Sequence, residues 1–244
     1  MPEGTTNPAR RLHHLLQQVR SGPGEKRARE VLAPVFGIPP EDVVALRRAL
    51  ILVDDLFQAT MDRISALEGV DHKAFLRRIP HMRQGLANLH LESQAKESLF
   101  GVLDPVALEA LDLCAARLGE AVKESELSED DLLSIESQVS ELFDYVDQAE
   151  IDPELRSVAL DLIESMRRAI VEYRIRGIDG LRSAVEDAVG KLTLYYLRKQ
   201  PDVDREPLNR IWRLVVTVEN MVARTLTYGP YLPDSILKML TLGS

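Results

Sequence analysis

The sequence contains almost no cysteine and few aromatic residues, and each shortage excludes a class of protein. Cys114 is the single cysteine among 244 residues, so neither a disulfide within one chain nor a Cys-x-x-Cys metal site can form. Aromatic residues make up 5% of the chain, while Leu, Ala, Arg and Glu are abundant. This composition favours helices that pack through aliphatic side chains.

Long apolar runs are also missing. The longest run, at 49–53, is far shorter than the roughly 20 residues that span a bilayer as a helix. The first eleven residues lack the apolar centre of a secretory signal. We therefore expect a cytoplasmic protein of bacterial type that does not enter a membrane.

Apolar residues recur at steps of three and four along most of the chain, which is the period of an amphipathic helix. Short connections between these segments predict antiparallel neighbours. We predict an all-α fold of about eight to ten helices, arranged as an antiparallel helical bundle or as stacked helix pairs. The longest apolar stripe consists of Val43, Leu46, Leu50, Val53, Phe57, Met61, Ile64 and Leu67.

The linkers give only weak evidence of domain boundaries. Residues 1–8 are polar and terminal, and we expect them to be disordered. Gly101 is the best candidate for a break between an N-terminal helical subdomain (9–100) and a C-terminal helical bundle (102–244). A single domain also fits these lengths.

Several helix ends carry their own signals. Ser128 followed by Asp131 is an acidic variant of the capping box. Asp152 before a proline predicts another N-terminus, and Gly37 fits the left-handed position at a C-terminus. Pro80 should break the helical segment in which it lies.

Negative charge is concentrated in one stretch. Residues 120–154 contain thirteen acidic residues and one basic residue, a formal charge of −12, whereas the whole chain carries −9. If the helices on either side of 151–152 form an antiparallel hairpin, Arg167 and Arg168 come level with Glu136. By the same count Arg174 and Arg176 come level with the start of the acidic helix, and such pairs would neutralise part of the charge.

Four carboxylates lie nearer the turn of that hairpin. The same alignment of the hairpin places no basic residue opposite these carboxylates, which are Glu141, Asp144, Asp147 and Glu150. The one exception is Arg156, which comes within reach of Glu150. We predict that these four residues form an acidic face that binds a protein partner with a basic surface. The overall acidity argues against nucleic-acid binding, because cations supply most of the affinity for phosphates.

A catalytic alternative comes from Arg83 and His90, which are separated by six residues. This spacing resembles the Arg–His signature of HEPN ribonucleases, a family of helical dimers. The resemblance implies that Arg83 would polarise the scissile phosphate and that His90 would transfer protons.

A second alternative is a helical enzyme that holds a metal between carboxylates. Asp54-Asp55 begins a segment that resembles the aspartate-rich motif of isoprenoid synthases, although Gln58 stands where the motif has a third aspartate. Asp144 and Asp147 form another pair on one helix face.

The leading hypothesis is a non-catalytic interaction or regulatory protein without a bound metal or cofactor. The sequence leaves open whether the apolar stripe at 43–67 pairs two copies of the chain or is buried within one.

Overall fold

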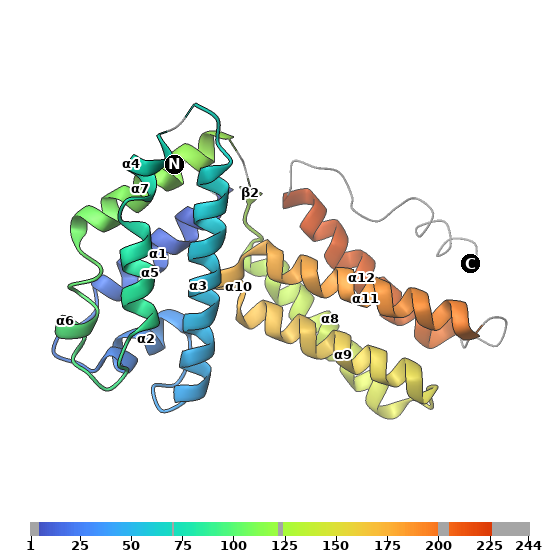
Figure 1. The fold of residues 1–244 in the computed structure, drawn as a ribbon. Coiled ribbons are helices and arrows are strands. Elements are labelled where there is room, and N and C mark those ends of the chain that lie inside the picture. The colour runs from blue at the N-terminus through green and yellow to red at the C-terminus, as the bar shows by residue number, and fades with distance from the viewer. Residues whose placement is uncertain (1–4, 70, 122–123, 200–204, 226–244) are drawn as a thin grey trace. The chain divides into compact units, whose positions relative to one another are not determined.

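The fold is all-α, as the sequence predicts (Figure 1). The computed structural model describes residues 5–69, 71–121, 124–199 and 205–225. In these ranges the strands are two residues long, β1 (Thr5–Thr6) and β2 (Glu124–Ser125), and do not change the fold class.

Helices supply nearly all of the regular structure, and the longer ones bury the apolar residues that recur at steps of three and four. In chain order they are α1 (Pro8–Arg20), α2 (Ala28–Phe36), α3 (Val43–Ser65), α4 (His72–Leu76), α5 (Ile79–Ala87), α6 (Ala95–Ser98), α7 (Pro105–Ala121), α8 (Glu129–Gln148), α9 (Pro153–Val171), α10 (Tyr173–Arg176), α11 (Ile178–Lys199) and α12 (Arg205–Thr225).

The chain divides into two compact units, each with its own core. The first unit comprises Met1–Lys123 and Arg174–Arg176, and the second comprises Glu124–Tyr173 and Gly177–Ser244. Gly101, where the sequence pattern placed the weak boundary, lies inside the first unit. The reason is that α7, which follows Gly101, packs against α1 and completes the first core.

Helix α1 is the centre of the first unit, where α2, α3 and α7 all pack against it. Residues 6 and 7, in the segment 1–8 that was expected to be disordered, make contacts at the start of this helix. The Asn7 side chain accepts a hydrogen bond from the Arg10 amide at 2.9 Å and donates one to the Ala115 carbonyl at 3.0 Å. Thr6 and Asn7 are both buried, and residues 1–4 lie outside the described ranges.

The apolar stripe of α3 is largely buried inside the first unit. Leu46, Val53, Phe57 and Ile64 are each at most 2% exposed. Helices α1, α2, α4, α5 and α7 cover this stripe. Its length is therefore explained by packing within one chain.

The second unit is a four-helix bundle of α8, α9, α11 and α12 (Figure 1). The helices contact one another in a ring, α8 with α9, α9 with α11, α11 with α12 and α12 with α8. Each sends a row of apolar side chains into a common core. The side of each helix that faces away from this core is exposed.

The predicted helix ends are largely confirmed. Gly37 ends α2 with a φ of 67°, a conformation that glycine adopts without steric cost. Asp152 caps α9 by accepting the amides of Glu154 and Leu155 at 2.9 and 3.3 Å. Pro80 lies in the first turn of α5, so the break falls just before that helix.

Two glycines inside helices predict opposite effects of a substitution by alanine. A Cβ at Gly190 in α11 would meet nothing within 4 Å, whereas a Cβ at Gly85 in α5 would overlap both methyl groups of Val102. Gly190→Ala should stabilise the fold by about 0.5–1 kcal/mol, because alanine loses less backbone entropy in a helix. Gly85→Ala should destabilise it by about 1–3 kcal/mol, because valine has little rotamer freedom.

Urea unfolding followed by far-ultraviolet circular dichroism measures both changes. A loss of stability in Gly190→Ala, or a gain in Gly85→Ala, would contradict the packing described for α11 and α5.

Candidate functional site

Helix α8 carries the acidic charge, and its N-terminus is built as predicted. Ser128 Oγ accepts the Asp131 amide at 3.1 Å, and Asp131 Oδ2 accepts the Ser128 amide at 3.2 Å. The Ser128 hydroxyl also donates to the Asp131 carboxylate and is the main cause that lowers the pKa of Asp131. Carboxylates in the first turn are favoured by the positive end of the helix dipole.

The carboxylates predicted to bind a partner lie toward the other end of α8. Asp144, Asp147 and Glu150 are exposed, and within the described ranges none of them has a hydrogen bond or an ion pair. Glu141 is also exposed and accepts one long hydrogen bond, at 3.3 Å, from the Ser137 hydroxyl.

The arginines of α9, Arg167 and Arg168, do not form the predicted pairs with Glu136 in the described ranges. The Arg167 guanidinium lies over the Phe143 ring, 4.7 Å from its centroid, and Arg168 pairs with Glu164 at 3.0 Å. Arg174 and Arg176 belong to the first unit. The prediction failed because an arginine stem and guanidinium also cover apolar surface, which a count of charges does not reveal.

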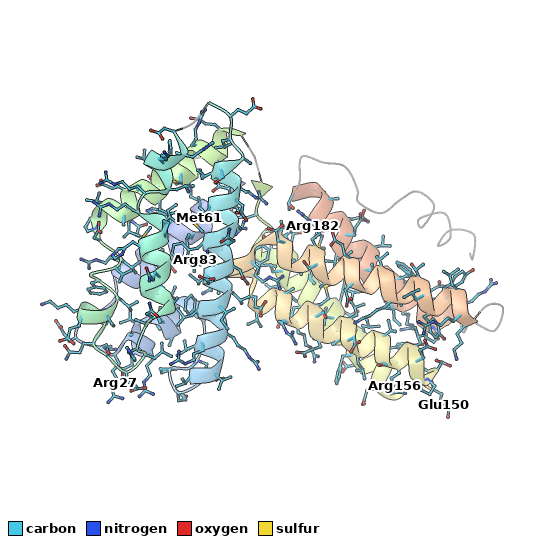
Figure 2. All side chains as sticks on the ribbon, viewed as in Figure 1. Arg27, Met61, Arg83, Glu150, Arg156 and Arg182 are labelled. Atoms are coloured by element: carbon cyan, nitrogen blue, oxygen red, sulfur yellow. The ribbon has the colours of Figure 1, made fainter. Side chains whose placement is uncertain are left out.

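Arg156 was expected near Glu150 but binds the backbone instead. Its guanidinium donates to the carbonyls of Val146 and Ala149, both at 2.7 Å. These carbonyls lie at the end of α8, where no helical amide is available to bond with them. Glu150 and Arg156 lie together where α8 turns into α9 (Figure 2).

The arginines that contact α8 on its other side come from helix α12. The sequence pattern did not show that α12 is a neighbour of α8. Arg210 lies 4.2 Å from the centroid of the Tyr145 ring and pairs with Glu206 at 2.7 Å. The Tyr145 hydroxyl donates to the same Glu206 carboxylate at 2.8 Å. These two donors, the Tyr145 hydroxyl first, lower the pKa of Glu206. Nearer the start of α8, Arg224 approaches Asp131 at 3.9 Å.

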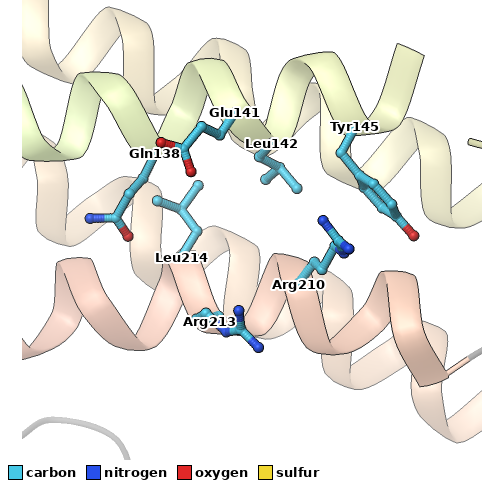
Figure 3. Close-up of a pocket in the computed structure, with 7 residues that line it drawn as sticks. All are labelled: Gln138, Glu141, Leu142, Tyr145, Arg210, Arg213 and Leu214. Carbon is cyan, nitrogen blue, oxygen red and sulfur yellow. The ribbon is translucent and has the colours of Figure 1, made fainter. Parts of the chain in front are cut away.

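A shallow pocket lies between α8 and α12 (Figure 3). Its volume is about 110 Å³, well below the roughly 300 Å³ at which sites for drug-sized ligands begin. One acidic residue lines the pocket from α8, two arginines line it from α12, and two leucines lie between them. The lining residues are Gln138, Glu141, Leu142, Tyr145, Arg210, Arg213 and Leu214.

Arg83, the candidate ribonuclease residue, is held by α3 (Figure 2). Its Nε and Nη2 donate to the two carboxylate oxygens of Asp54 at 2.5 and 2.7 Å, and its Nη1 donates to Gln58 at 2.5 Å. His90 is exposed and follows the end of α5, and no hydrogen bond or ion pair in the described ranges joins it to Arg83.

The cluster around Arg83 also contains the residues that resembled a metal motif. Gln58 donates to Asp62 at 2.8 Å, so Asp54, Gln58, Asp62 and Arg83 form one chain of contacts between α3 and α5. Among the described residues, no group of three or more His, Cys, Asp or Glu side chains is placed to hold a metal ion.

No protein-family model, curated protein or solved structure matches this chain. In the described ranges, none of the helices combines the length and the apolar character needed to cross a bilayer.

The pairing of Arg83 with Asp54 predicts a pH-dependent contribution to stability. The hydrogen bond from Arg83 is the main cause that lowers the pKa of Asp54 in the folded state. A lowered folded pKa stabilises the fold at neutral pH, and the contribution is lost as pH falls from about 4 through the folded value. Arg83→Met should cost at most about 1 kcal/mol at pH 7, since solvent screens this partly exposed pair.

Urea unfolding at neutral and acidic pH measures this difference, with Arg47→Met as the matched control. Arg47 is exposed and has no partner in the described ranges. A loss of stability in Arg83→Met that stays constant into the acid range would show that the ion pair is not its cause.

The buried thiol of Cys114 predicts chemical inertness. Cys114 is 0% exposed on α7, and burial raises the pKa of its thiol to about 11. The thiolate is the form that attacks a disulfide reagent, and it is scarce at neutral pH when the pKa is this high. In a time course with a chromogenic disulfide reagent, the native protein should react many times more slowly than the urea-unfolded protein. Equal rates would mean that Cys114 is accessible in solution.

Proposed function

We propose that the protein is a non-catalytic interaction or regulatory protein whose second unit binds a protein partner with a basic surface. Three of the four carboxylates predicted to bind this partner, Asp144, Asp147 and Glu150, are called the acidic face below, and the fourth, Glu141, lines the pocket with α12. One observation carries the proposal. All three carboxylates are exposed, and none has an ion pair or hydrogen bond within the described ranges.

The position of the acidic face on α8 supports this proposal. The last turn of α8 contains Asp147 and no basic residue. Negative charge at that end is disfavoured by the helix dipole, by about 0.3–1 kcal/mol for each exposed group. A lysine or arginine brought by a partner would remove this unfavourable interaction and pair with the free carboxylate.

The spacing of the acidic face supports a partner with several cations. Asp144 and Asp147 are separated by one turn of α8, a rise of roughly 5 Å. Glu150 continues the series beyond the helix end. A row of carboxylates at this spacing matches basic side chains distributed along a protein surface, and complementary charge accelerates such encounters.

Ribonuclease activity through Arg83 and His90 has less support. Three of the five N–H groups of the Arg83 guanidinium already donate to Asp54 and Gln58, and the negative charge of Asp54 opposes the approach of a phosphate.

Charge reversal of the acidic face tests the proposal. In the triple variant Asp144→Lys/Asp147→Lys/Glu150→Lys, capture of basic proteins from an extract of the producing cells should fall about tenfold or more, because like charges then face each other. Quantitative mass spectrometry of the captured proteins, with circular dichroism to check folding, measures the effect.

The matched control is Glu41→Lys/Glu68→Lys/Glu109→Lys in the first unit. These exposed carboxylates have no partner in the described ranges, and the change in net charge is the same. If both folded triple variants lose the same proteins, the interaction reflects net charge alone and the proposed site is wrong. If neither loses any, the acidic face binds no such partner.

A further inference from the structure

The groove between α8 and α12 carries opposite charges on its two sides. Glu141 extends from the α8 side, and Arg210 and Arg213 extend from the α12 side (Figure 3). Arg210 is already paired with Glu206, but Arg213 has no hydrogen bond or ion pair from its side chain in the described part of the chain. The Glu141 carboxylate has only the long contact from Ser137. Each side of the groove therefore offers one charge that the chain leaves unmatched.

The floor of the groove is apolar. Leu142 and Leu214 line the pocket between the two charged sides. Both leucines are at most 5% exposed because they belong to the core of the second unit, so the charged side chains beside them offer the contacts that a partner can make.

We propose that this groove pairs two copies of the chain, with Glu141 of each copy bound to Arg213 of the other. A second copy of the chain is the proposed partner because the acidic residue on one side of the groove is complementary in charge to the arginine on the other side. A surface with this property can bind itself through a two-fold axis.

The register of the helices determines which axis fits. Helices α8 and α12 run antiparallel, with Tyr145 level with Arg210 and Asp131 level with Arg224. A two-fold axis that runs along the groove, parallel to both helices, places α8 of one copy opposite α12 of the other. Rotation about this axis leaves the position of each residue along the axis unchanged. Glu141, which lines the pocket with Arg213, then meets Arg213 of the second copy.

The other two-fold axis in the plane of the interface is perpendicular to the helices. That axis would place α8 over α8 and bring two strongly acidic helices together. Like charges across an interface cost several kcal/mol. The charges of the groove therefore favour the parallel axis, which forms two symmetric Glu141–Arg213 pairs.

This dimer goes beyond the proposed function and uses a different part of α8. Glu141 and Asp147 are six positions apart, which places them about 120° apart around the helix. Glu141 faces the groove with α12, and the acidic face does not line that pocket. Reversing Asp147 and Glu150 should therefore leave dimerisation unchanged while it removes the partner, so the two proposals can fail separately.

Charge reversal and charge exchange test the dimer directly. Sedimentation equilibrium of the full chain over the micromolar range should show a monomer–dimer equilibrium that weakens as salt is added. Glu141→Arg and Arg213→Glu should each raise the dimer dissociation constant about tenfold or more, because each creates two like-charged contacts. The double variant Glu141→Arg/Arg213→Glu should recover most of the loss, because exchanging the charges restores both pairs.

Matched controls separate this effect from a general change of charge. Glu186→Arg on α11 and Arg47→Glu on α3 alter exposed residues that have no partner in the described ranges, and both should dimerise as the unaltered chain does. Glu141→Gln and Arg213→Gln provide milder changes if a reversal unfolds the protein. They should weaken the dimer less than the reversals.

Three results would overturn the proposal. The first is a chain that remains monomeric throughout the range at low salt. The second is a pair of folded single variants that dimerise normally. The third is a folded double variant that does not recover, since an interface built on Glu141 and Arg213 must tolerate their exchange.

Discussion

Each helix must have its apolar side covered by other helices, and this requirement determines where the polar side chains can lie. Burying one leucine or valine contributes about 1.5–3 kcal/mol, whereas an exposed ion pair contributes about 0–1 kcal/mol. Packing of apolar side chains therefore determines how the helices are arranged, and the charged side chains form whatever contacts that arrangement allows. In the first unit α2, α3 and α7 cover α1, and in the second unit four helices cover one another in a ring.

The arginines of the second unit show this order of importance. Arg167 and Arg210 each lie over an aromatic ring of α8, Phe143 and Tyr145 respectively. A guanidinium in this position covers the ring face and remains hydrated at its edge. Both arginines are thereby used for packing at the edge of the bundle, and the carboxylates on the outer side of α8 gain little from them.

The sequence predicted the parts of the fold that depend on neighbouring residues along the chain. The capping box at Ser128, the cap at Asp152 and the left-handed Gly37 were all recognised, because each signal lies within four residues of the helix end it forms. Helical period likewise identified the buried side of α8, where Ile135 and Val139 enter the core. These features need no knowledge of which helices meet.

Contacts between distant segments could not be predicted in this way. Periodicity shows that α8 has an apolar side but not that α12 covers part of it, so the Tyr145–Glu206 hydrogen bond and the charged groove were missed. The ion pair of Arg83 with Asp54 was missed for the same reason. Both residues had been noticed separately, each as part of a different motif, and only the packing of α3 on α5 brings them together.

The two ends of α8 differ in how well their charges are satisfied, and this difference locates the candidate site. At the N-terminus, the capping box, the helix dipole and Arg224 all favour Asp131. At the C-terminus the dipole opposes Asp147, and Arg156 bonds to carbonyls rather than to a carboxylate. Repulsion between acidic residues three or four positions apart adds about 0.2–0.5 kcal/mol for each pair. A local arrangement that opposes folding in this way is expected where a surface serves binding, since a cationic partner turns the same charges into a favourable contact.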